Sequence, residues 1–561
     1  MRKFICTTLV VTLALSLVAC GRDSRDSKGD ELAGLVDPVY ADEDSGEDII
    51  DTEEPGDDSD DSDEVEETVS EVKTVDYPEV YLGYVYDNSY EDSDGLYRSY
   101  ATMTAPIVSL SDEAALFYPE LQEELARLSE KWIDYGRTTF NILDEYSRDE
   151  NEPFAEEWKE YSDKRTVFIK RSDREVLSFV AEEKSCYGPD DVEFDYETVN
   201  FKTETGERIL LTDLVTDVKS FADRVYNTVV SMHPEADTGK VREMVDIFAG
   251  SDTFGNRMTV ENDKVVIYFS DGDFGCGAFS VPLSYAENSD IFSGEYTSNA
   301  NANYIIDGVL GGDNYVDVNS DGKPDIVRID YETDEYENVI SYSIKVNGID
   351  LYWFTADEFN MVFSLKPYFV HTSNGTYLYL EHQEIDDYNE FAIFSLGESS
   401  VSLTHTTGLT PHGNFVDRVY ADGEEHFLWR AFSNGEVMQL GERTDLLGTQ
   451  DLIADYTVGP DGIPVMQGGY YTFSIGSELI FNMDIETDVV DEDGNVISHA
   501  AGIHYGDSCY PYRTDNSTYV DVKLSDGRIA RFKFGTNPSG WGYTLNDLSQ
   551  DDIFQSINYA G

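Results

Sequence analysis

Short runs in which apolar and polar residues alternate recur along this 561-residue chain, and they constrain its fold most. Many contain Tyr or Phe, of which the chain has 38 and 29, and these residues favour strands. Near the C-terminal end, residues 518–524 and 528–534 flank the pair Asp526 and Gly527. An Asp-Gly pair between two alternating runs is typical of a β-hairpin. We therefore expect a β-rich protein.

A helical pattern interrupts the strand-like runs in the first half of the chain. Leu121, Leu125, Leu128, Trp132 and Tyr135 recur at helical spacing, which places them on one stripe of a helix. Strand-like runs follow this stripe, and a second amphipathic helix is expected near 218–232. This mixture is an α+β pattern.

The order of these patterns predicts a multidomain protein, in agreement with its length. We expect an α+β N-terminal domain over residues 77–296, followed by mainly-β domains. The first of these is a β-rich domain over 297–452, and the second is a small, SH3-like β-barrel over 453–561.

The first residues of the chain have the pattern of an export signal. Residues 1–3 carry positive charge, and the apolar run over 4–18 is too short to span a membrane as a mature helix. Leu-Val-Ala-Cys at 17–20 resembles the lipobox of bacterial lipoproteins. The resemblance implies that a signal peptide over 1–19 is removed and that Cys20 carries lipid. The mature chain would then be anchored to the cell membrane on its extracytoplasmic face. The alternative is a secretory or membrane segment with a chance cysteine.

Residues 20–76 are dominated by acidic side chains, with dense like charge at 57–64 and almost no aromatic residues. Such a segment holds too little apolar surface to offset the entropy of ordering, so we expect a disordered acidic linker. The whole chain has 113 acidic and 38 basic residues, a formal net charge of −75. This charge argues against a nucleic-acid partner and favours cationic proteins, divalent metals or basic wall components. The alternative is that the acidity only keeps the protein soluble.

Motifs that would identify a reaction are absent from the sequence. It has no Gly-x-Ser-x-Gly elbow, no phosphate-binding glycine loop and no metal-binding histidine pair. Beyond Cys20, the cysteines are Cys186, Cys276 and Cys509, which allow one disulfide at most. We therefore expect a protein that is not an enzyme.

Several short motifs in the N-terminal domain resemble a known bacterial extracytoplasmic domain. Residues 200–206 and 210–214 are similar to its Asn-Phe-Asp, Thr-Gly-Lys and Leu-x-Asp-Leu-Phe run, and 265–269 with 277–282 resemble its last two strands. That domain occurs in lysozyme-sensing anti-sigma factors and in some peptidoglycan deacetylases. Its histidine-containing turn is replaced here by Gly-Pro-Asp-Asp at 188–191. The resemblance implies an envelope-sensor-like domain over 77–296.

The same resemblance places Cys186 and Cys276 next to strand ends of one sheet. It therefore implies a disulfide between them. The alternative is two free thiols.

One loop has the spacing of a calcium site. Loop positions are counted from Asp317 as position one. Oxygen-bearing side chains around Gly322, together with the backbone carbonyl at position seven, Lys323, can surround a hard cation. These residues are Asp317, Asn319, Asp321, Lys323 and Asp325. Arg328 occupies position twelve, where an EF-hand has Glu, so the loop looks more like the calcium loops between strands of β-propeller-type repeats. We expect a structural Ca²⁺; the alternative is a turn that binds no metal.

These observations favour a lipid-anchored binding protein of the bacterial cell envelope. Its expected partner is a cationic protein such as lysozyme, or a wall component such as peptidoglycan. One alternative is a cell-wall carbohydrate-active enzyme whose site is assembled across domains and therefore has no visible motif. Another is that the domains act as spacers.

Overall fold

The computed structural model describes residues 77–93, 96–151, 159, 161–188, 191–251, 256–294, 296–297, 303–334, 337–355, 362–384, 389–411, 415–419, 425–474, 476–537 and 542–559. All of them belong to one compact unit, Lys73–Gly561. The predicted signal peptide, Cys20 and the predicted linker lie outside the described residues. Within the described part, no helix is both long and apolar enough to cross a membrane.

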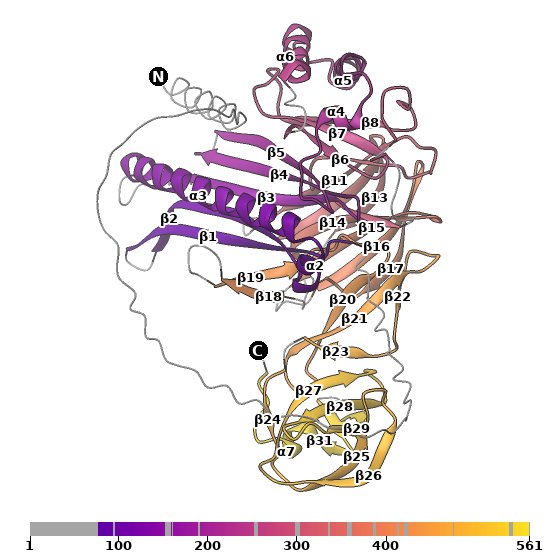
Figure 1. Ribbon diagram of the computed structural model, residues 1–561. Coiled ribbons are helices and arrows are strands. Elements are labelled where there is room, and N and C mark those ends of the chain that lie inside the picture. Colours follow the sequence, from indigo (N-terminus) through magenta and orange to yellow (C-terminus); the bar gives the residue numbers. More distant parts are fainter. Residues whose placement is uncertain are drawn as a thin grey trace, which may run out of the picture. The chain divides into compact units, whose positions relative to one another are not determined.

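The first sheet combines strands from two distant parts of the sequence (Figure 1). Its strands are β1 (Val80–Ser93), β2 (Leu96–Leu110), β3 (Tyr161–Ser172), β4 (Val176–Tyr187), β5 (Val192–Lys202), β18 (Phe415–Val419) and β19 (Glu425–Arg430). The order across the sheet is β18-β19-β1-β2-β3-β4-β5. Only β2 and β3 are parallel neighbours in this sheet of described strands. Parallel neighbours need a long crossover, which the two following helices provide.

The crossover contains α2 (Asp112–Phe117) and the long α3 (Pro119–Glu150). Ser111 caps α2 through its side chain, and proline begins α3, where its missing N–H costs nothing. The predicted stripe lies on α3, where Leu121, Leu125, Leu128 and Trp132 are buried and Tyr135 is half-buried. At Gly136 a Cβ would lie 2.9 Å from the Met103 sulfur, so glycine permits close packing of α3 on the sheet.

A smaller α+β lobe follows the first sheet. It contains α4 (Leu211–Leu214), α5 (Val218–Met232), α6 (Thr238–Ser251), β6 (Met258–Val260), β7 (Lys264–Phe269) and β8 (Phe279–Ser284). The strands form an antiparallel sheet in sequence order. The helix predicted near 218–232 is confirmed as α5, whose N-terminus is capped by Asp217. The patterns did not predict α6.

A large antiparallel sheet covers the middle of the chain. It contains β9 (Tyr304–Asp307), β10 (Asp313–Val316), β11 (Asp325–Thr333), β12 (Val339–Val346), β13 (Ile349–Thr355), β14 (Val362–Thr372), β15 (Gly375–Glu384), β16 (Asn389–Gly397) and β17 (Ser400–Thr407). The main order is β10-β11-β12-β14-β15-β16-β17, with β13 paired to β12 and β9 to β14. The calcium-type loop joins β10 to β11.

The last sheet extends to the C-terminal end of the described chain. It contains β20 (Met438–Thr444), β21 (Gln450–Val458), β22 (Pro464–Met466), β23 (Tyr471–Phe473), β24 (Leu479–Ile480), β25 (Ile485–Val490), β26 (Val496–Ile503), β27 (Ser508–Thr514), β28 (Tyr519–Leu524), β29 (Ile529–Thr536), β30 (Tyr543–Leu545) and β31 (Leu548–Ser549), and α7 (Gln550–Ile553) follows. The predicted hairpin is confirmed as β28–β29, with Gly527 at φ +88° in its turn.

The predicted fold class is confirmed: an α+β N-terminal region is followed by mainly-β sheets. Two sheets cross the expected boundaries. Strands β18 and β19 return to the first sheet from within 297–452, because β19 pairs with β1. The last sheet begins at β20, also before residue 453.

Candidate functional site: a cavity where three sheets meet

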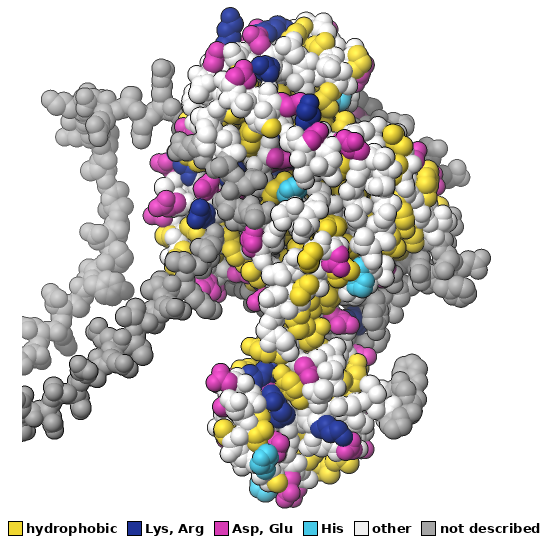
Figure 2. All heavy atoms as spheres, turned by 90° about the vertical axis from the view of Figure 1, so that its right-hand side faces the viewer, with side chains coloured by type: hydrophobic (Ala, Val, Ile, Leu, Met, Phe, Trp, Pro, Cys, Tyr) yellow, Lys and Arg dark blue, Asp and Glu magenta, His cyan; other side chains and the backbone are white. Residues whose placement is uncertain are grey.

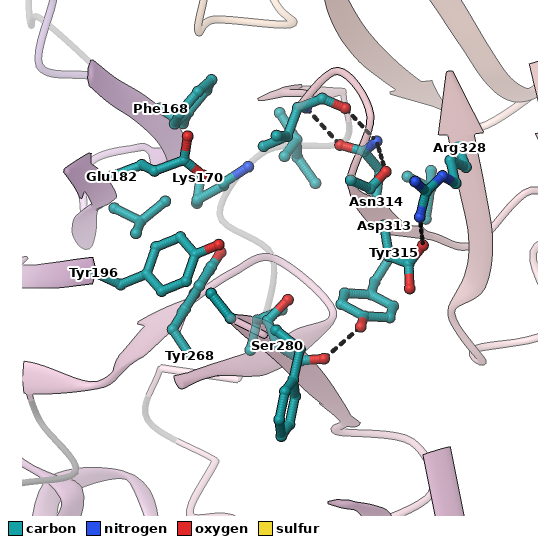
Figure 3. A pocket seen from close by; sticks show the side chains of 18 of the residues that line it. Phe168, Lys170, Glu182, Tyr196, Tyr268, Ser280, Asp313, Asn314, Tyr315 and Arg328 are labelled. Carbon is teal, nitrogen blue, oxygen red and sulfur yellow. Dashed lines mark hydrogen bonds and ion pairs between the residues drawn. The ribbon is translucent and has the colours of Figure 1, made fainter. Parts of the chain in front are cut away.

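A cavity of about 270 Å³ lies where the first sheet, the β6–β8 sheet and the middle sheet meet. Strands β3, β4 and β5 form one wall, β7 and β8 form a second, and β9 to β11 contribute a third. Figure 3 shows Lys170, Tyr196 and Tyr268 on one side and Asp313, Tyr315 and Arg328 on the other. The cavity is therefore lined by charged, phenolic and apolar side chains.

Lys170 on β3 is the most constrained cation of this cavity. Its side chain is only 5% exposed. The Nζ atom donates a hydrogen bond to the carbonyl of Asp307 at 2.5 Å and lies 5.5 Å from the centre of the Phe168 ring. Burial lowers the pKa of Lys170, while the Glu261 and Asp307 carboxylates act in the opposite direction.

Asp307 ends β9 and joins the middle sheet to the first. Its carboxylate accepts the Ile169 N–H at 2.8 Å, and its backbone carbonyl accepts Lys170. The side chain is buried, and burial raises the pKa of this carboxyl. Next to it, a Cβ at Gly308 would lie 2.8 Å from the Phe369 ring. The backbone at 307–308 therefore approaches its neighbours closely, which fixes the amine of Lys170 beside the cavity.

Two glutamates line the cavity in different electrostatic settings. Glu261 is buried and pairs with Lys264 at 3.0 Å, and it also accepts the Thr259 hydroxyl at 3.1 Å. Glu182 on β4 is half-buried and forms no ion pair among the described residues. Burial raises the pKa of Glu182, while the charge of Lys170 and a hydrogen bond from Tyr196 oppose that shift. Glu261 is therefore neutralised by its own lysine, whereas Glu182 faces the cavity without a cation in contact with it.

Phenols and one imidazole supply further polar groups. The Tyr196 and Tyr268 rings lie 5.3 Å apart between centroids, and burial raises the pKa of both phenols, so both remain protonated donors. His233, at the C-terminal end of α5, stacks on Phe279 at 3.9 Å. Its Nδ1 contacts Glu235 at 3.2 Å, while its buried Nε2 has no hydrogen-bond partner.

The opposite wall is held by the loop before β10. Asn314 braces this loop, since its side-chain oxygen accepts the Val309 N–H at 2.7 Å and its amide donates to the Val309 and Val327 carbonyls. Tyr315 donates its hydroxyl to the Ser280 carbonyl at 2.5 Å, which ties β10 to β8. Arg328 pairs with carboxylates of the same sheet. The Asn314, Tyr315 and Arg328 side chains of this wall therefore have partners within the protein.

The predicted calcium residues lie together in the β10–β11 loop, apart from the cavity. Asp317 and Asp325 are buried, Gly322 has φ +81°, and the Asp317 carboxylate accepts backbone N–H groups of Asn319, Asp321 and Gly322. In the described part of the chain, no three His, Cys, Asp or Glu side chains are placed to hold a metal ion. A calcium ion would therefore need the Asn319 side chain and backbone carbonyls such as that of Lys323. The calcium assignment stays a prediction.

The expected disulfide between Cys186 and Cys276 is not formed in this structure. Cys186 lies near the end of β4, where its thiol donates to the Gly188 carbonyl at 3.4 Å. Cys276 lies in the β7–β8 connection and packs against the core of the smaller α+β lobe. Strand β4 belongs to the first sheet, whereas β7 and β8 belong to the β6–β8 sheet. The resemblance had placed both cysteines next to strands of one sheet, and this is not so here.

Sequence patterns did not indicate the cavity residues. Lys170 ends the strand-like run at 166–170, and Asp307 follows the apolar residues 304–306. The one sequence feature that could have indicated these residues is a charged side chain within an apolar strand. Such a side chain is buried when the strand is covered on both faces. Nothing in the sequence brings the two residues together.

Comparisons with known proteins give a structural likeness without an activity. No protein-family model matches the sequence. A search of curated proteins also finds no match. Among solved structures, the chain is similar to a DUF3298-family member from Bacteroides fragilis, at 12% identity and a TM-score of 0.27, covering 39% of this chain and 96% of that one. A DUF3298-family protein from Pseudomonas aeruginosa matches at 10% identity, with the same TM-score and coverage. The function of this domain family is unknown.

Proposed function

We propose that this chain is a lipid-anchored binding protein on the extracytoplasmic face of a bacterial cell membrane. The observation that carries the proposal is the cavity, which combines a buried amine, phenols and a carboxylate without an ion pair inside a β framework. A concave site with a few convergent polar groups is the usual form of a ligand site. The lipobox-like residues and Cys20 supply the expected location.

The partner that we propose is a wall component, with a cationic protein such as lysozyme as the second partner class. Most of the acidic excess falls in residues 77–561 rather than in the expected linker. On the face shown in Figure 2, acidic side chains are spread among basic ones and do not gather in one patch. Attraction of a cationic protein would then come from the summed field, which raises the rate of encounter more than the affinity.

Binding is tested by titrating the full chain, purified in detergent, with soluble peptidoglycan fragments and separately with lysozyme. We expect saturable binding of the fragments that changes little with salt, and lysozyme binding that weakens steeply between low and physiological salt. If neither partner binds at any salt concentration, the proposed function is wrong.

The location is tested by metabolic labelling with palmitate. Wild-type chain should carry the label and sediment with membranes, whereas Cys20→Ser should lose both properties. A Cys509→Ser variant is the matched control, because Cys509 is buried in the last sheet and should not affect lipidation. An unlabelled wild-type chain would remove the anchor from the proposal.

A carbohydrate-active enzyme of the wall is the second candidate. Glu182 favours it, because a carboxyl with a raised pKa in a cavity with a second carboxylate, Glu261, is the arrangement of a general acid. Glu182→Gln should then abolish release of soluble fragments from peptidoglycan while leaving fragment binding in place. Absence of such release by the wild-type chain would leave the binding function alone.

A further inference from the structure

Lys170 forms no ion pair among the described residues, although the Glu261 and Asp307 carboxylates act on its charge without contacting it. Its one hydrogen bond among the described residues goes to the neutral Asp307 carbonyl. By contrast, the buried Lys264 nearby contacts two carboxylates, Glu261 at 3.0 Å and Asp263 at 2.7 Å. An ammonium has three donors, and burying it without a counter-ion is costly. Lys170 is therefore incompletely satisfied by the protein itself.

The groups beside Lys170 are suited to a ligand that both accepts and donates hydrogen bonds. Tyr196 and Tyr268 line the same side of the cavity and are protonated, and the Tyr196 hydroxyl already donates to Glu182 (Figure 3). His233 also lines the cavity, and because its Nδ1 donates to the Glu235 carboxylate, its buried Nε2 without a partner is an acceptor for a ligand N–H or O–H. The Lys170 amine and the His233 Nε2 atom, both short of hydrogen-bond partners, thus line one cavity.

We propose that this cavity binds a small molecule through a single carboxylate group, which becomes the counter-ion of Lys170. The inference deepens the proposed binding function and rests on it. A monoanion is favoured over phosphate, because Glu182 and Glu261 line the same cavity and the whole chain is strongly negative, so each added negative charge is repelled. The cavity volume of about 270 Å³ suits a ligand of the size of a short peptide end or a small organic acid.

The direct test compares acid and amide forms of the same probe, which differ at the terminal group alone. Acetyl-alanyl-alanine with a free carboxylate, in both the D,D and L,L forms, and the corresponding amides are titrated into the full chain by calorimetry. At least one acid should bind at least tenfold more tightly than its amide, and inorganic phosphate should bind more weakly than that acid. Tenfold corresponds to about 1.4 kcal/mol. Equal affinity for acid and amide would overturn the proposal without any variant being made.

Variants locate the binding to Lys170. Lys170→Met keeps the unbranched side chain as far as Cε and removes the ammonium, so the affinity for the acid should fall at least tenfold and become equal to that of the amide. Lys184→Met is the matched control: it changes charge equally in the neighbouring strand β4, where Lys184 is exposed, and should leave affinity unchanged. Tyr268→Phe should weaken binding by a smaller factor, and circular dichroism confirms that each variant is folded.

Failure of this inference is distinguishable from failure of the proposed function. If peptidoglycan fragments bind Lys170→Met as tightly as wild type, the envelope function stands and the carboxylate site is wrong. If the acid probe binds through Lys170 while neither peptidoglycan fragments nor lysozyme bind, the carboxylate site stands and the proposed partners are wrong.

Discussion

Asp163 of β3 offers a quantitative test of the electrostatics of this fold. Its side chain is 4% exposed and accepts the Ser185 hydroxyl at 3.3 Å. Beside it, Glu183 pairs with Arg165, which also contacts Glu197 at 3.2 Å. Burial, and then the charge of Glu183, raise the pKa of Asp163 from 3.8 to about 7. Replacing Asp163 with Asn should therefore stabilise the protein at neutral and alkaline pH.

The sign follows from proton linkage. The unfolded chain releases the Asp163 proton near pH 3.8, while the folded chain keeps it until about pH 7. The contribution of this group to stability is thus complete below pH 3.8 and is lost as the pH rises to 7, at about 1.36 kcal/mol per pH unit. The stability lost between pH 3.8 and pH 7 through this group is about 4 kcal/mol. The amide that replaces the carboxyl never ionises, so the stability of Asp163→Asn relative to wild type should grow by about 3 kcal/mol between pH 5 and pH 8.

Urea denaturation of the full chain at pH 5, 6, 7, 8 and 9, followed by tryptophan fluorescence, measures this difference. The transition to follow is the one that changes the emission of Trp132, because the Arg165 guanidinium lies 5.7 Å from its ring centre. Asp134→Asn, at an exposed position of α3, is the control and should keep the pH profile of wild type. A stability difference that is constant from pH 5 to pH 9, or an Asp163→Asn variant that is less stable than wild type at pH 8, would refute the reasoning.

Further predictions concern packing, a turn and the metal loop. Leu125→Ala should lower the free energy of unfolding by about 2 to 5 kcal/mol, measured by the denaturant midpoint, because Leu125 on the buried face of α3 is fully buried. Gly206→Ala should lower the melting temperature, because φ is +65° and the new Cβ would lie 2.8 Å from the Glu120 backbone; an unchanged melting temperature would contradict this contact. Calcium should raise the melting temperature of wild type and have no effect on Asp317→Ala; if calcium shifts neither protein, the loop is a turn without metal.

Regular elements were predicted well from the sequence because their signals are local. The leucine spacing of α3 and the helix at 218–232 express the 3.6-residue period of a helix that is covered on one side. The β28–β29 hairpin is encoded by alternation and by Asp526-Gly527, since a glycine accepts the positive φ of the turn. Such features require only neighbours within a few residues.

The candidate site was not predictable in the same way. Lys170 and Asp307 are 137 residues apart, and no pattern separates this lysine from one at the protein surface. Lys170 is buried because three sheets meet around it. That meeting depends on how whole sheet faces pack against one another. The disulfide inference failed for a related reason: residues that a family resemblance places near one sheet belong to different sheets here.

By itself, the sequence determined the fold class, the principal helices and the C-terminal hairpin, because alternation, helical period and turn chemistry act over short distances. It also determined the strong negative charge. Only the tertiary structure decided that β18 and β19 complete the first sheet, that Cys186 and Cys276 remain thiols, and that a lysine without an ion pair among the described residues faces a polar cavity. These features depend on contacts between segments more than a hundred residues apart or between separate sheets, and such contacts are set by the burial of complementary faces rather than by local sequence.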